Sequence, residues 1–135
     1  MADIIYVDGC VCENCKPLDP KKRLRWKNCS FLPFKIEGIG TGLGAVLFFP
    51  EESLPKLIEK IERSKAQEIL VAMNRDCLFL MREKPDSDEN SRIREVRIIL
   101  QEAARIIRTK IRGPKITGVC WSGSQNLHLG TDPAS

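Results

Sequence analysis

The alternation of apolar and polar positions is most regular between residues 92 and 112. Apolar residues recur there at helical spacing on one side of the helical wheel, and arginines gather on the other side. The segment contains neither glycine nor proline, follows Asn90 and Ser91, either of which can cap a helix, and stops at a Gly-Pro pair. The pattern predicts one amphipathic helix from Arg92 to Arg112 whose apolar face packs on a sheet.

A second helical pattern follows residue 50, with Leu54, Leu57, Ile58 and Ile61 on one face. Two short apolar runs joined by turn-forming residues precede each helix. They cover residues 31–37 and 45–49 before the first helix, and 69–73 and 77–81 before the second. Each pair predicts a β-hairpin, and residues 2–8 and 116–121 predict an edge strand and a further short strand.

The order of these elements predicts two hairpin-helix units, a weak duplication in arrangement and not in residue identity. We expect an α+β fold, with an antiparallel sheet of four to five strands and two helices on one face. The chain has 135 residues, 42% hydrophobic and 30% charged, which is typical of one globular domain. Within it we expect a cysteine-rich lobe (1–29), a core domain (30–121) and a flexible tail (122–135).

Four of the six cysteines fall within twenty residues, in the pattern C-x-C-x2-C-x13-C. No export signal precedes them, and in a reducing compartment clustered thiols more often ligate a metal than form disulfides. The two-residue spacing inside Cys-Glu-Asn-Cys suits tetrahedral Zn²⁺. The sequence therefore predicts a structural zinc site; an iron-sulfur cluster, a redox role, or unligated or disulfide-bonded cysteines remain alternatives. The predicted ligands are Cys10, Cys12, Cys15 and Cys29.

The net charge of +4 conceals a strong asymmetry along the chain. Residues 16–27 and 91–115 together carry a net charge of +11, so the remainder is acidic. Clustered cations of this kind indicate an anionic partner, and nucleic acid is the commonest one. A solvated basic face is the simpler interpretation of either segment alone.

Within the predicted second helix the arginines form one stripe, and guanidinium groups match phosphate oxygens bidentately. The first basic segment surrounds a tryptophan that could stack on an unpaired base, or equally cover the metal site or the core. The predicted nucleic-acid-binding residues are Lys21, Lys22, Arg23, Arg25, Trp26 and Lys27 in the loop, and Arg94, Arg97, Arg105, Arg108 and Arg112 in the helix.

No motif in the sequence supports enzyme chemistry or a membrane span. The alternating glycines of residues 38–44 fit neither nucleotide-binding fingerprint, and residues 86–97 lack the glycine and glutamate of a calcium loop. No apolar run approaches the roughly 20 residues of a membrane helix, and no export signal is visible, so we expect an intracellular protein, cytoplasmic or nuclear. Cys120 and His128 could form a nucleophile-base pair, but nothing in their spacing favours it.

The sequence thus favours a non-enzymatic protein that binds nucleic acid, RNA or single-stranded DNA ahead of duplex DNA, mainly through phosphates. The alternative is an adaptor or dimerising regulator whose basic helix docks an acidic protein or a second copy of the chain. An enzyme that uses Cys120 and His128 is the third hypothesis.

Overall fold

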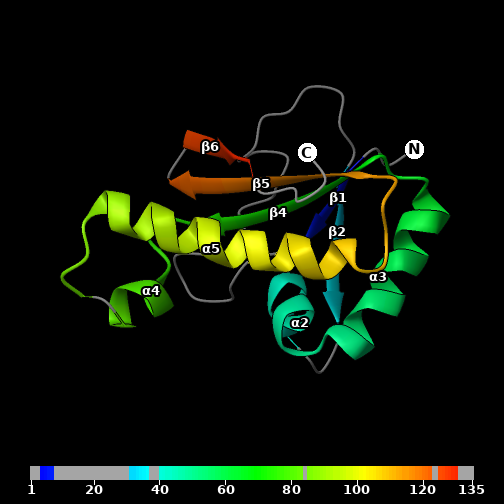
Figure 1. Cartoon of the computed structure of the whole chain (residues 1–135), viewed down its shortest axis with the longest axis horizontal. Helices are drawn as coiled ribbons and strands as arrows, with labels where there is room; N and C mark the ends of the chain where they lie inside the picture. Colours follow the sequence, from blue (N-terminus) through cyan, green and yellow to red (C-terminus); the bar gives the residue numbers. More distant parts are fainter. Residues whose placement is uncertain (1–3, 8–30, 37–39, 84, 123–124, 131–135) are drawn as a thin grey trace.

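The computed structural model describes residues 4–7, 31–36, 40–83, 85–122 and 125–130, which form a mixed six-stranded sheet and four helices (Figure 1). The strand order is β3-β2-β1-β4-β5-β6. The strands are β1 (Ile4–Val7), β2 (Phe31–Ile36), β3 (Gly40–Thr41), β4 (Glu68–Asn74), β5 (Lys115–Ser122) and β6 (Gln125–Leu129). The helices are α2 (Gly42–Phe48), α3 (Pro50–Ser64), α4 (Leu78–Glu83) and α5 (Glu89–Arg108).

The predicted antiparallel sheet is wrong. β1 pairs with β2 on one side and β4 on the other, β4 pairs with β5, and all three pairings are parallel. Only the outermost strands, β3 and β6, run antiparallel to their neighbours. β1 is therefore a central strand and not the expected edge strand.

Both predicted hairpins fail because their second arm is helical. Residues 45–49 fall largely within α2, and residues 77–81 lead into α4. An apolar run of about five residues has no periodicity that separates a buried strand from one turn of buried helix. Helices instead occupy the connections that the structure describes: α2 and α3 lie between β2 and β4, and α4 and α5 lie between β4 and β5, whose parallel pairing requires a crossover.

The main hydrophobic core lies on the face of the sheet that the helices cover. α2, α3 and α5 each contribute buried apolar side chains to it, with Val46, Leu57 and Leu100 fully buried. The strands contribute every second residue, for example Ile5 and Val7 of β1. Figure 1 shows α5 running along the sheet, with α2 beside its last turns.

The opposite face of the sheet is also buried. A second core cluster consists of strand residues alone, and its members are Ile4, Tyr6, Leu70, Ala72, Val119 and Trp121. Burial on both faces explains why β1 and β4 are nearly continuous apolar runs, because parallel strands lack the alternation of a half-solvated sheet.

α5 begins and ends earlier than the sequence indicates. Its N-cap is Asp88, whose side chain accepts a hydrogen bond from the Ser91 backbone nitrogen at 2.7 Å. At the other end the Thr109 hydroxyl donates to the carbonyl of Ile106 at 2.6 Å, and the chain leaves the helix four residues before the predicted end at Arg112.

None of the helices in the described part of the chain combines the length and the apolar character needed to cross a membrane.

Candidate functional site

Ten of the predicted site residues lie outside the residues that the structure describes. They are the cysteines Cys10, Cys12, Cys15 and Cys29, and the basic segment Lys21, Lys22, Arg23, Arg25, Trp26 and Lys27. Among the described residues, no three His, Cys, Asp or Glu side chains gather closely enough to hold a metal ion. The zinc site therefore stays a prediction.

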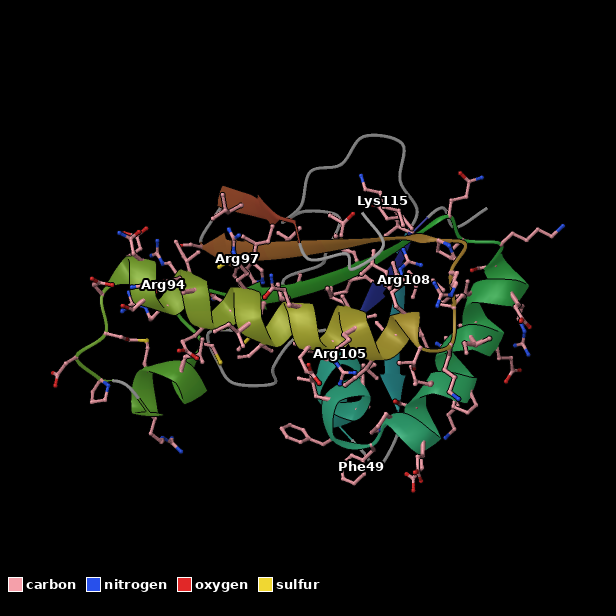
Figure 2. The ribbon with its side chains drawn as sticks, in the orientation of Figure 1. Phe49, Arg94, Arg97, Arg105, Arg108 and Lys115 are labelled. Carbon is pink, nitrogen blue, oxygen red and sulfur yellow. The ribbon has the colours of Figure 1, made fainter. Side chains whose placement is uncertain are left out.

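Three of the predicted arginines, Arg94, Arg97 and Arg105, are exposed on α5, and we call them the α5 ridge (Figure 2). Val96, Leu100 and Ile107 anchor the opposite side of the helix in the core. Because the helix rises about 1.5 Å per residue, the ridge extends roughly 16 Å along its axis. The amphipathic helix predicted from the sequence thus places these three cations on the surface.

Within the described residues, Arg105 is the member of the ridge whose guanidinium hydrogen-bonds to a carboxylate. Its Nη2 lies 2.6 Å from Glu102 Oε1 and its Nε lies 3.0 Å from Oε2. The hydrogen bond to Arg105 lowers the pKa of Glu102, and the same bond raises the pKa of Arg105. Both side chains are about half exposed or more, so this ion pair adds little stability and a competing anion can open it.

Arg108 does not belong to the ridge. Its guanidinium turns to the end of its own helix, where Nη2 donates to the carbonyl of Pro114 at 2.6 Å and Nη1 to that of Ile111 at 3.3 Å. These bonds satisfy carbonyl groups after the last helical turn and secure the connection to β5. Arg112 lies beyond α5 and is exposed, as are Lys110 and Lys115; we call these three residues, which follow the last turn of the helix, the basic end of α5.

A second polar cluster lies at the carboxyl ends of β4 and β5. The sequence predicted only a turn after residue 73. The Arg75 guanidinium contacts both carboxylate oxygens of Asp76 at 3.1 Å and also pairs with Glu89. The hydrogen bond to Asp76 is the main cause of a raised Arg75 pKa. Arg92 reaches Asp76 at 3.5 Å and donates to the carbonyl of Ser87 at 2.7 Å. The cluster ties the end of the sheet to the first turn of α5.

A cavity of about 430 Å³ opens beside this cluster. Arg75, Cys120 and Ser122 are among its lining residues, together with Glu89, Ile93, Trp121 and Leu127. In Figure 1 the arrowheads of β4 and β5 lie at the end of the sheet where α5 begins. Open parallel sheets bind ligands at the carboxyl ends of their strands. The cavity is therefore a candidate binding site, which the expected antiparallel sheet would not have predicted.

Cys120 is not prepared for nucleophilic chemistry in this arrangement. Burial raises the pKa of its thiol to about 11, so the sulfur is protonated at neutral pH. The register of β5 and β6 pairs Cys120 with Leu127 and Val119 with His128. Cys120 and His128 are therefore not cross-strand partners.

Sequence reasoning also missed two aromatic residues. Phe48 and Phe49 belong to the run 45–49 that the sequence predicted as a strand, and they are 76% and 48% exposed. They lie at the end of α2 and at the N-cap of α3. No periodicity in the sequence indicates that they are exposed, because their exposure depends on the chain changing direction between these two helices.

Comparison of the chain with family models, with curated proteins and with solved structures gave no match.

Proposed function

We propose that the protein binds nucleic acid by contacts between the α5 ridge and successive phosphates. The observation that carries this proposal is the presentation of Arg94, Arg97 and Arg105 as exposed guanidinium groups on a helix whose other face is fixed in the core. A helix held in this way presents its cations without an ordering cost for the backbone, and most protein-nucleic acid hydrogen bonds go to phosphate and sugar. The basic end of α5, Lys110, Arg112 and Lys115, extends the positive surface.

The Glu102–Arg105 pair is compatible with this role. An exposed ion pair of this kind contributes about 0–1 kcal/mol, so a phosphate can replace Glu102 as the partner of Arg105 at little cost. Arg94 and Arg97 are the sharper test of the proposal, because both are exposed and, among the described residues, neither side chain is held in a carboxylate ion pair like that of Arg105; Arg94 donates to the Ser91 hydroxyl at 3.3 Å.

The experiment measures binding of random RNA, single-stranded DNA and duplex DNA over a range of salt concentration. In the double variant Arg94→Gln/Arg97→Gln we expect weaker binding and a slope of log affinity against log salt that is flatter by roughly one and a half to two units. The matched control, Lys56→Gln/Arg63→Gln, removes two exposed cations from α3 and should leave the slope nearly unchanged.

Two results would contradict the proposal. One is the absence of any nucleic-acid binding by the parent protein at low salt. The other is an equal loss of affinity in the α3 control, which would show that net charge matters and the position of the ridge does not. Retained binding of RNA and single-stranded DNA with weak binding of duplex would support the expected preference for unpaired strands.

A second candidate function is the binding of a small polar ligand in the cavity beside Arg75. The parallel sheet and the position of this cavity at its carboxyl edge favour it. A ligand at a hundred times its dissociation constant stabilises the folded state by about 2.7 kcal/mol, so thermal unfolding against a panel of small anions and neutral metabolites can detect it. Ile93→Trp, which narrows the cavity, should abolish any such stabilisation.

A further inference from the structure

The junction between α2 and α3 exposes two aromatic side chains. Phe48 and Phe49 are adjacent in the chain, and both are among the exposed large hydrophobic residues of the described structure. Figure 2 shows Phe49 at the outer corner where α2 meets α3. Contiguous apolar surface of this kind usually marks an interaction site, and aromatic residues are enriched in interfaces between proteins.

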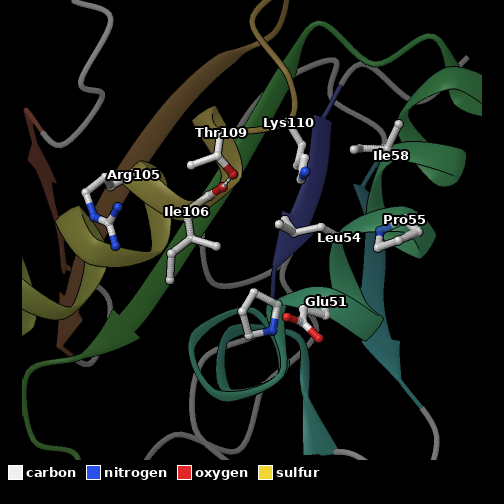
Figure 3. A pocket seen from close by; sticks show the side chains of 9 residues that line it. Glu51, Leu54, Pro55, Ile58, Arg105, Ile106, Thr109 and Lys110 are labelled. Atoms are coloured by element: carbon white, nitrogen blue, oxygen red, sulfur yellow. Dashed lines mark hydrogen bonds between the residues drawn. The ribbon is translucent and has the colours of Figure 1, made fainter.

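A cavity of about 460 Å³ begins at the next residue, Pro50, and lies between α3 and the last turns of α5 (Figure 3). Leu54 and Ile58 of α3 and Ile106 of α5 give it an apolar lining. The Thr109 hydroxyl at its edge already donates to the Ile106 carbonyl. The cavity therefore offers room for an apolar group more readily than for a polar one.

The charged residues around this cavity have opposite signs on its two sides. Glu51 stands on the α3 side, and Lys110 and Arg105, the latter also paired with Glu102, stand on the α5 side (Figure 3). A nucleic acid entering the cavity would meet Glu51, and a uniformly acidic or basic protein would meet one like charge. A partner that carries both signs in the reverse order would match both sides.

We propose that this surface, which comprises Phe48, Phe49 and the cavity with its charged rim, is a self-complementary interface with a second copy of the chain. In a two-fold dimer each contact occurs twice, with residue i of one copy on residue j of the other. Phe48 and Phe49 of each copy then cover the cavity of the other, and Glu51 faces Arg105 and Lys110 across the axis. In the dimer Arg105 and Lys110 face Glu51 of the second copy, so nucleic acid contacts the α5 ridge there through Arg94 and Arg97, which lie in earlier turns of α5 and do not line the cavity.

The experiment measures the molar mass of the nuclease-treated full chain by analytical ultracentrifugation over a wide range of protein concentration. We expect a concentration-dependent dimer for the parent protein and a monomer for Phe48→Ser/Phe49→Ser. Both residues are exposed, and serine at position 49 is a favourable N-cap for α3, so this variant should fold normally. The matched control Ile98→Ser removes another exposed apolar residue, 57% exposed on α5, and should remain a dimer.

A charge exchange tests the two-fold arrangement itself. Glu51→Arg alone and Arg105→Glu/Lys110→Glu alone should each be monomeric, because each places like charges opposite one another. An equimolar mixture should form a heterodimer, because both pairs of facing charges are then opposite in sign. A parent protein that is monomeric throughout, a dimer that survives loss of both phenylalanines, or a mixture that does not associate would overturn the proposal.

Discussion

At the scale of single residues, Arg97 and Arg108 show how one sequence pattern can contain two different roles. Both belong to the arginine stripe predicted for the helix. Arg97 is exposed, whereas Arg108 is half-buried and donates to the carbonyls of Ile111 and Pro114. A helical wheel gives the direction of a side chain from the axis, but it does not show that the helix ends at Arg108. The role of Arg108 could therefore not be predicted from spacing.

This difference predicts that substitution by glutamine lowers stability at Arg108 and has little effect on it at Arg97. Arg108→Gln removes charge-assisted hydrogen bonds to two carbonyl groups and should lower the free energy of unfolding by about 1–2 kcal/mol. Arg97→Gln should change it by less than about 0.5 kcal/mol, as is usual for an exposed position. Urea unfolding of the two variants and the parent protein makes the comparison, and equal effects would show that Arg108 has no structural role.

Cys120 provides a second prediction at this scale. Burial raises the pKa of its thiol from an ordinary value of 9.0 to about 11, and the nearby Arg75 only partly opposes the shift. Because the folded-state pKa is the higher one, the stabilisation is complete below pH 9.0 and is lost as the pH rises towards about 11. Urea unfolding of the parent protein and of Cys120→Ala is compared across this pH range, so that the contributions of the other titrating side chains cancel. The variant should lose less stability as the pH rises, and parallel curves would argue against a buried thiol.

At the scale of elements, the sequence predicted the two long helices well and the strand pairing badly. The apolar faces of α3 and α5 extend over several helical turns, so their period is visible in the sequence. By contrast, the runs at 45–49 and 77–81 are too short for such a period. Strand pairing depends on contacts between distant residues, such as Val71 with Gly118, which no local pattern records.

The N-cap of α5 contributes to stability at the scale of a single element. The N-cap residue, Asp88, accepts a hydrogen bond from the Ser91 nitrogen, and that bond lowers the pKa of the Asp88 carboxyl group. Asp88→Ala removes the cap and should lower the melting temperature by a few degrees, whereas Asp86→Ala in the same loop should not. The cap's contribution should fall as the pH drops through the lowered pKa. Equal melting temperatures for both variants at neutral pH would contradict this assignment of the cap.

At the scale of the whole molecule, the parallel sheet changes where function can be sought. An antiparallel sheet with helices on one face leaves its other face to solvent, and the basic helix is then the obvious functional surface. The parallel sheet is buried on both faces. The carboxyl ends of its neighbouring strands β4 and β5 meet near Arg75 and Asp76, at the kind of edge where parallel sheets bind ligands. The α5 ridge was predictable from charge spacing, but the cluster at this edge was not, because it needs β4 and β5 to be neighbours.

Burial on both faces can be tested with two leucines that are fully buried on opposite sides of the sheet. Leu100 of α5 belongs to the core under the helices, and Leu70 of β4 belongs to the second cluster. Leu100→Ala and Leu70→Ala should each reduce the free energy of unfolding by about 2–5 kcal/mol, because each removes buried methyl groups and leaves a cavity. Ile98→Ala, on the exposed side of α5, should cost less than about 0.5 kcal/mol. If urea unfolding showed Leu70→Ala to be as mild as Ile98→Ala, the second face would be open to solvent, and the sheet would resemble the half-exposed one that the sequence predicted.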